Sequence, residues 1–219
     1  MIYITAYPLT QRINPMRKLL LTTAAVAAAI AGAVAGEPSF GTFTDTRDGQ
    51  TYKTVKIGAQ TWMARNINYQ IKSGSWCYND SASYCKQYGR LYDWKTAKTV
   101  CPAGWKLPSR EDWNILFASA GGEDIAGKKL KSKSGWNNRD DGKSGNGMDD
   151  YGFSALPGGD RYSGGNFYST GNYGNWWSAT EGSDGNAYTR GMYYDYDHVY
   201  EFNFVKSLGF SVRCVADRP

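Results

Sequence analysis

The sequence is poor in the residues that most catalytic and metal sites require. It contains one histidine, His198, and four cysteines, none of which form a Cys-x-x-Cys pair. A serine or cysteine triad would have to use His198, which lies in an alternating segment (196–200) typical of a strand or hairpin. A redox or copper site would need a closer pair of cysteines or a neighbouring histidine. These absences disfavour most forms of catalysis.

The chain also lacks a long hydrophobic run. The apolar run at 19–34 has sixteen residues, fewer than the ~20 of a transmembrane helix. It follows two basic residues and ends in the small-x-small form of a signal peptidase site, with cleavage expected after Ala35. We interpret residues 1–35 as an over-extended start plus a signal peptide that begins at Met16. Residues 36–219 are then a single extracytoplasmic domain without a transmembrane segment; an uncleaved anchor is the alternative.

Neither sign of charge is in marked excess. The formal net charge is +5, of which Arg12, Arg17 and Lys18 supply three, so +2 remains for residues 36–219. Basicity therefore gives no argument for a nucleic-acid partner, and we expect none. The basic run 128–133 (KKLKSK) is interpreted as a solvated surface.

Aromatic residues and glycine are abundant instead. The 17 Tyr, 8 Trp, 8 Phe and 26 Gly favour short strands, tight turns and a loop-rich surface. Alternating or β-branched runs bounded by turn residues predict strands at 43–45, 51–57, 61–64, 152–156, 176–180, 188–194, 199–204 and 209–215.

Two helices are expected between the early and late strands. Residues 90–100 repeat apolar side chains at helical spacing and end before Cys101-Pro102. A second helix follows Ser109, a candidate N-cap, and presents Trp113 and Leu116 on one face before Gly121. Strands, then helices, then many strands indicate the α+β class with an antiparallel sheet.

Six motifs together carry a family resemblance. They are 51–64 (TYKTVKIGAQTWMA), 88–94 (YGRLYDW), 101–109 (CPAGWKLPS), 150–159 (DYGFSALPGG), 176–181 (WWSATE) and 211–214 (SVRC). With them the chain resembles the Fibrobacter succinogenes major paralogous domain family of exported bacterial proteins. That family is in turn similar to the C-type-lectin-like fold, which the formylglycine-generating oxidases share. The resemblance implies two helices that flank a twisted antiparallel sheet with long irregular loops.

The four cysteines follow an export signal and predict a disulfide framework. Spacing alone leaves three connectivities open. In the resembled fold a disulfide commonly joins the first part of the domain to the last strand. The resemblance therefore implies a Cys101–Cys214 bridge, and Cys77–Cys85 would then close a short loop.

The resemblance to the oxidases extends to the fold and not to activity, because the cysteines here belong to structural motifs. The carboxylate pairs 149/150 and 195/197 offer an alternative based on glycoside hydrolysis. Acids in turns more often bond the backbone, so we expect no enzyme and no cofactor. Calcium stays open, because Asp184, Asn186, Asp195 and Asp197 provide hard oxygen ligands, although they match no ligand motif.

Aromatic and acidic residues in the late loops are the candidate ligand contacts. They are Tyr162, Phe167, Tyr168, Tyr173, Tyr194, Asp195, Tyr196 and Asp197. Tyrosine offers a flat amphipathic face at low entropy cost, and a sugar ring can stack on it while Asn and Asp accept hydroxyl hydrogen bonds. The alternative is that such rings fill a loop-heavy core.

We therefore expect a secreted or cell-surface binding module without catalysis, for polysaccharide or another glycan. The alternative is a structural or adhesive surface protein that binds protein partners or self-assembles. An enzyme is the third hypothesis.

Overall fold

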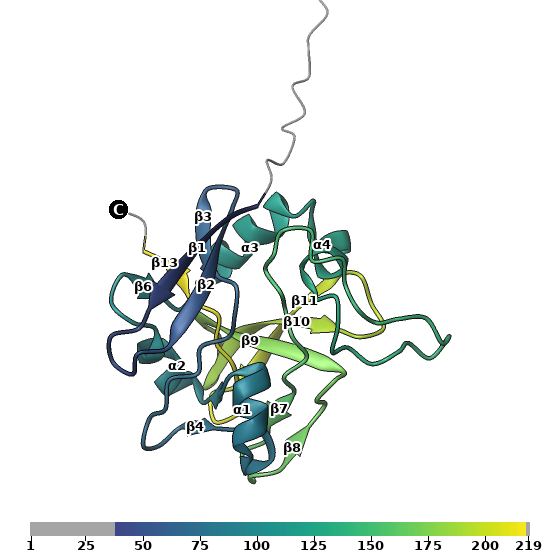
Figure 1. The fold of residues 1–219 in the computed structure, drawn as a ribbon. Coiled ribbons are helices and arrows are strands. Elements are labelled where there is room, and N and C mark those ends of the chain that lie inside the picture. The colour runs from purple at the N-terminus through teal and green to yellow at the C-terminus, as the bar shows by residue number, and fades with distance from the viewer. Residues whose placement is uncertain (1–37, 218–219) are drawn as a thin grey trace, which may run out of the picture. The chain divides into compact units, whose positions relative to one another are not determined.

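The computed structural model describes residues 38–217, which form four α-helices, one 3₁₀ helix and thirteen strands (Figure 1). The α+β class is thereby confirmed. The leader and cleavage site expected in residues 1–35 lie outside the described residues. None of the described helices is long and apolar enough to cross a membrane.

The first sheet contains five strands in the order β1-β2-β3-β13-β6, all antiparallel. Their bounds are β1 Ser39–Thr44, β2 Thr51–Ile57, β3 Gln60–Met63, β6 Trp105–Lys106 and β13 Val215–Ala216. The early hairpins predicted from the sequence are present. Gly58 has a φ of 58° in the tight turn between β2 and β3, a conformation that favours glycine. The C-terminal strand β13 therefore joins the sheet that the first strands build.

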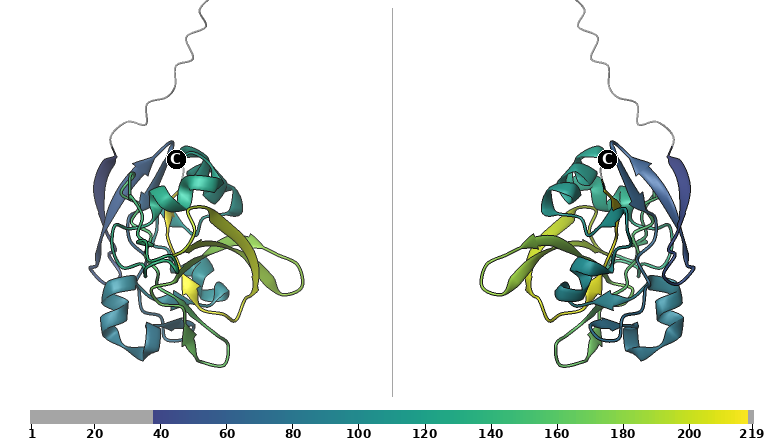
Figure 2. Two further views of the ribbon diagram at one scale, coloured as in Figure 1. Left: turned by 90° about the vertical axis from the view of Figure 1, so that its right-hand side faces the viewer. Right: turned by 90° about the vertical axis from the view of Figure 1, so that its left-hand side faces the viewer.

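The second sheet has six strands in the order β11-β10-β9-β12-β5-β4. Their bounds are β4 Ser75–Trp76, β5 Leu91–Tyr92, β9 Tyr173–Glu181, β10 Asn186–Tyr193, β11 Val199–Val205 and β12 Phe210–Ser211. Only β12 and β9 run parallel. A separate hairpin joins β7 Asp160–Arg161 to β8 Phe167–Tyr168. The long β9–β11 strands extend away from the β1–β3 sheet (Figure 2).

The helices are more numerous than predicted. They are η1 Tyr78–Asp80, α1 Ala82–Tyr88, α2 Trp94–Val100, α3 Arg110–Ser119 and α4 Glu123–Leu130. The two expected helices are α2 and α3, but α2 begins only at Trp94 because the preceding residues pair as β5. Ser109 caps α3 in a reciprocal capping box with Asp112, as its position predicted.

Two expectations about local structure were wrong. Residues 152–156 form no strand, and only Ala155 makes an isolated bridge, to Lys131. The basic run 128–133 is not a solvated surface throughout, because Lys131 is fully buried after α4. Both segments contact residues that are remote in sequence, and these contacts hold parts of them in the interior.

The core divides into two clusters on the two faces of β9. Trp176 and Trp177 are consecutive and fully buried, and alternation along the strand sends them to opposite faces. Trp176 packs with Trp62 and Trp113 on one side, and Trp177 packs with Phe210 on the other. Most of the motif tryptophans are core residues.

A buried polar centre joins the motif segments. The guanidinium of Arg213, fully buried, donates to Asn66 Oδ1 from Nε at 3.0 Å and from Nη2 at 2.9 Å. It also donates to the carbonyl oxygens of Met63, Phe153 and Ser154. Burial lowers the pKa of Arg213 to about 9. Within residues 38–217 no carboxylate forms an ion pair with it, so Asn66 and the backbone carbonyls satisfy this charge. Two of those carbonyls belong to residues 153 and 154, which contact the guanidinium instead of pairing as a strand.

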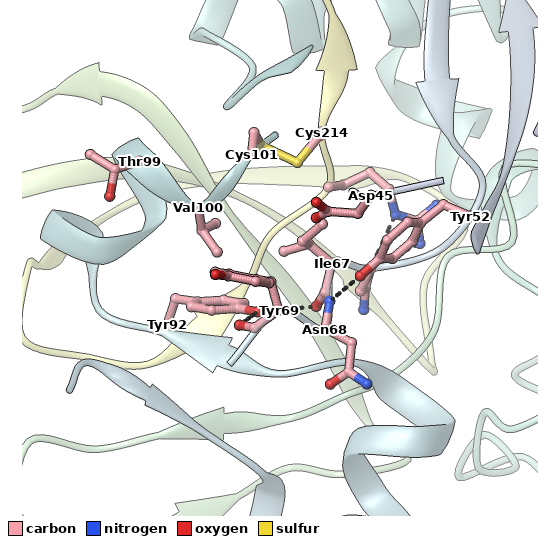
Figure 3. The surroundings of a disulfide bond; sticks show 12 residues. Asp45, Tyr52, Ile67, Asn68, Tyr69, Tyr92, Thr99, Val100, Cys101 and Cys214 are labelled. Atoms are coloured by element: carbon pink, nitrogen blue, oxygen red, sulfur yellow. Dashed lines mark hydrogen bonds between the residues drawn. A yellow bond between two sulfur atoms is a disulfide. The ribbon is translucent and has the colours of Figure 1, made fainter. Parts of the chain in front are cut away.

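Both disulfides form the pairing that the resemblance implied. Cys77 bonds to Cys85, and Cys101 bonds to Cys214 across 113 residues. The long bridge ties the end of α2 to the chain before β13, beside the buried rings of Tyr52 and Tyr92 (Figure 3). The Tyr52 hydroxyl accepts from the Asn68 amide at 3.0 Å, and burial raises the pKa of Tyr52 to about 12.

Candidate ligand-binding site

The β7–β8 hairpin presents the most exposed of the candidate aromatic residues. Tyr162 is 52% exposed and Tyr168 is 48% exposed, and their rings pack edge to face with centroids 5.0 Å apart. Such an arrangement leaves ring faces available to solvent. The hairpin therefore displays two neighbouring flat surfaces at its outer side.

An open hollow of about 490 Å³ adjoins these rings. It is lined by Asn79, Asp80, Gly165, Asn166, Phe167 and Tyr168. One wall is η1 and the other is the turn of the hairpin, which lie at the same end of the domain (Figures 1 and 2). Amide and carboxylate groups thus stand opposite aromatic rings, the combination that suits a hydroxyl-rich ligand.

The η1 wall is held in an uncommon conformation. Asn79 and Asp80 are consecutive residues with φ of 49° and 54°, in the left-handed region. The Cys77–Cys85 bridge encloses both of them. Backbone of this kind persists only where its surroundings hold it, and it is concentrated at functional sites.

Ring contacts join the two walls. Tyr78 of η1 packs on Phe167 at 5.3 Å and on Tyr84 of α1 at 5.0 Å. The guanidinium of Arg161 lies 4.1 Å above the ring of Trp76 and 5.7 Å from that of Phe167. These contacts fix the hairpin against β4 and η1, so the hollow is preformed.

The base of the hairpin contains a buried carboxyl group. Asp160 is 6% exposed, and its Oδ1 atom has no hydrogen-bond partner within residues 38–217. Burial raises the pKa of Asp160 to about 6, and a hydrogen bond with Ser169 opposes this effect. Asp160 pairs with Tyr168 across the hairpin. A titratable carboxyl group is therefore buried directly opposite β8, the strand that carries the exposed ring of Tyr168.

The other candidate residues lie elsewhere, near the β10–β11 turn. Tyr173 at the start of β9 packs on Tyr193 of β10 at 4.2 Å. The Tyr194 hydroxyl hydrogen-bonds to Asp140, and Asp197 forms an ion pair with Arg139. These side chains are engaged in structural contacts, whereas the ring of Tyr196 is 44% exposed. Asp195 has partial exposure in the same turn.

Lys131 holds this turn in place. Its buried ammonium donates to the carbonyl oxygens of Tyr193 and Tyr196, at 2.8 Å each. Burial lowers the pKa of Lys131 to about 8. Nothing in the sequence pattern distinguished Lys131 from the neighbouring lysines, which are partly or fully exposed.

The oxygen ligands considered for calcium are divided between two turns. Asp184 and Asn186 lie at the start of β10, and Asp195 and Asp197 follow its end. Eight residues of strand, about 26 Å, separate the turns. In the part of the chain that the structure describes, no three acidic, histidine or cysteine side chains are grouped to hold a metal ion.

His198 is surrounded by aromatic rings. Its imidazole lies 4.2 Å from the ring of Tyr200 and 4.9 Å from that of Tyr196.

Helix η1 with Asn79 and Asp80 was not predicted from the sequence, because a left-handed conformation of two polar residues has no signature in the pattern. The short spacing of Cys77 and Cys85 was the one available signal.

The fold and the two bridges define a disulfide-bonded α+β domain. The family model of the Fibrobacter succinogenes major domain matches residues 55–216. The chain therefore belongs to the Fibrobacter succinogenes major domain family. Neither a curated protein nor a solved structure matches the chain.

Proposed function

We propose that this protein is a non-catalytic, polysaccharide-binding module that uses the hollow between η1 and the β7–β8 hairpin. The observation that carries the proposal is the pair of exposed rings, Tyr162 and Tyr168, beside a preformed hollow lined by Asn79, Asp80 and Asn166. A sugar ring stacks its C–H face on such rings. Its hydroxyl groups donate to the carboxylate and amide oxygens.

We also propose a C-type-lectin-like fold and a location outside the cytoplasm. A long-range bridge from a helix end to the last strand supports the fold. Two disulfides in a chain without free cysteines among the described residues support an oxidising compartment. The single histidine, packed between tyrosine rings, supports a role without acid–base catalysis.

Binding to insoluble and soluble polysaccharides tests the function. In a pull-down with calcium or with a chelator, we expect the oxidised protein to be retained on at least one polysaccharide. Tyr168→Ala should weaken retention by roughly fivefold, because stacking on one aromatic ring contributes on the order of 1 kcal/mol. Its thermal melt should stay close to that of the parent, because the ring is exposed.

Tyr196→Ala is the matched control, since it removes an equally exposed tyrosine at the other candidate cluster. Unchanged retention of this variant supports the hollow as the site. Loss of retention in Tyr196→Ala with normal binding by Tyr168→Ala would move the site to the β10–β11 turn. Absence of retention on every polysaccharide would overturn the proposed function.

A further inference from the structure

Strand β11 forms an open edge of the second sheet. It pairs with β10 on one side and is the outermost strand in the sheet order. The amide of Tyr194 bonds to the Asn172 carbonyl, so even-numbered residues of β10 direct their backbone groups towards β9. Odd-numbered residues of β10 therefore bond to the even-numbered residues of β11, such as Phe202, which is opposite Thr189.

The odd-numbered residues of β11 consequently direct their backbone groups to the open edge. These residues are Val199, Glu201, Asn203 and Val205, although the carbonyl oxygen of Val205 already accepts from the Leu208 amide at 3.1 Å. Within residues 38–217, neither Glu201 nor Asn203 forms a backbone hydrogen bond with a segment other than β10. Such a row of donors and acceptors is a template for pairing with another strand.

The side chains of β11 favour such pairing. Tyr200, Phe202 and Phe204 are half-buried on one face, and their rings follow one another at 5.5 and 5.6 Å. Val205 on the other face is 49% exposed. The strand contains no lysine or proline, the residues that commonly protect an edge from pairing.

Charge does not oppose self-association at this edge. Glu201 is the one charged residue of β11, and its carboxylate binds Arg110 and Arg190 of the same chain at 2.6 Å each. The one carboxylate of the strand is therefore paired within its own chain. Among possible occupants, a second β11 is complementary in hydrogen bonding, in charge and in its aromatic face.

We propose that β11 pairs antiparallel with β11 of a second copy of this chain, about a two-fold axis at Phe202. In this register Phe202 faces its own copy, Tyr200 faces Phe204, and Glu201 faces Asn203, so no like charges are opposed. The edge-directed residues Glu201 and Asn203 form the central hydrogen-bonded pairs. Phe202 occupies a non-hydrogen-bonded pair, in which side chains approach most closely. The six-stranded sheets of the two copies then form one continuous sheet.

The contact area determines the expected strength. One seven-residue edge offers less surface than the ~800 Å² per partner of a stable interface. The dimer should therefore dissociate on dilution. Sedimentation velocity of the oxidised protein over a concentration series should show a monomer–dimer equilibrium, and a monomer at every concentration would overturn the proposal.

Cysteine cross-linking tests the register. Phe202→Cys places two thiols in one cross-strand pair, with Cα atoms ~4.5 Å apart, within the range of a disulfide. Val205→Cys is the control, because residue 205 of one copy faces residue 199 of the other. The two residues 205 are then six strand positions apart, a distance of ~20 Å. Under mild oxidation we expect covalent dimer from Phe202→Cys in at least tenfold excess over Val205→Cys.

Mass analysis would verify that both native disulfides remain, and thermal melts would verify folding of both variants. Equal cross-linking of the two variants, or none from a folded Phe202→Cys, would overturn the proposal. The result is independent of the proposed glycan site, because the hollow contains no residue of β11.

Discussion

Replacing Asp160 by asparagine should remove a pH-dependent loss of stability. In the folded protein burial raises the pKa of this carboxyl from 3.8 to about 6. Below pH 4 the group is protonated in both the folded and the unfolded chain, and it makes no difference to folding. As the pH rises from 4 to 6, the unfolded chain ionises first, so the free energy of unfolding falls. Above pH 6 both states are ionised and the loss is complete.

The magnitude follows from the shift of about two pKa units. Each unit corresponds to 1.36 kcal/mol, so the carboxyl destabilises the folded protein by about 3 kcal/mol at neutral pH relative to pH 4. An amide has a similar shape and does not ionise. Asp160→Asn should therefore be more stable than the parent above pH 6, by up to about 3 kcal/mol, and should match it below pH 4.

Urea denaturation of the parent and Asp160→Asn at pH 3.5 to 8 provides the measurement. The difference between the two free energies isolates Asp160, because other carboxyl groups titrate equally in both proteins. Parallel pH profiles for the two proteins would refute the reasoning. In that case the Asp160 carboxylate is hydrated in the folded protein, either by water that enters the base of the β7–β8 hairpin or after a rearrangement of the hairpin.

The remaining predictions concern the buried polar centre and the disulfides. Arg213→Met should destabilise the protein by about 3 kcal/mol or more, because three carbonyl oxygens lose the guanidinium donor and Asn66 Oδ1 keeps only the donor of Trp176. A loss under about 1 kcal/mol in urea denaturation would contradict this role. Serine at Cys101 and Cys214 should cost about 5 kcal/mol, since the bridge spans 113 residues. Serine at Cys77 and Cys85 should cost about 2.5 kcal/mol and weaken polysaccharide binding further than stability alone explains, because that bridge holds η1. Equal stability losses for the two bridges would count against this chain-entropy argument.

Several features of the fold were predictable because their causes are local. The N-cap at Ser109 depends on a side chain three residues from its partner, and the turn at Gly58 depends on one residue. The burial of Trp176 and Trp177 follows from the hydrophobicity of their rings in a strand. The pairing of the cysteines, in contrast, required the family resemblance, because spacing left three choices.

The two missed helices lack the pattern on which prediction depends. Helix α1 has seven residues, of which the first turn ends the loop closed by the Cys77–Cys85 bridge, and its sequence shows little apolar periodicity. Helix α4 carries acids in its first turn and lysines in its last, which favours the helix dipole. This helix was not predicted, because its last turn belongs to the basic run that was interpreted as a solvated surface. Lys131 in that run is buried by contacts with carbonyl groups more than sixty residues away.

The candidate site also depends on contacts between residues that are remote in sequence. The sequence pattern indicated tyrosines in the late loops as ligand contacts, and three of them, Tyr162, Tyr168 and Tyr196, are exposed. It grouped them with Tyr173 and Tyr194, whose rings have structural neighbours in β10 or a hydroxyl partner in the 131–150 segment. The opposing wall with Asn79 and Asp80 lies eighty residues before the start of the hairpin, so no local pattern connected the two.

The sequence by itself determined the family, the α+β class, the bridging residues and most of the tryptophan core, because these depend on composition, local periodicity and recurring motifs. The tertiary structure alone decided which polar groups are buried and which surfaces meet. Arg213 and Lys131 are buried because distant carbonyl groups satisfy their charge. The hollow exists because a disulfide-bound turn stands against a remote hairpin. Such contacts depend on the folded path of the chain, which residue types and spacing do not specify.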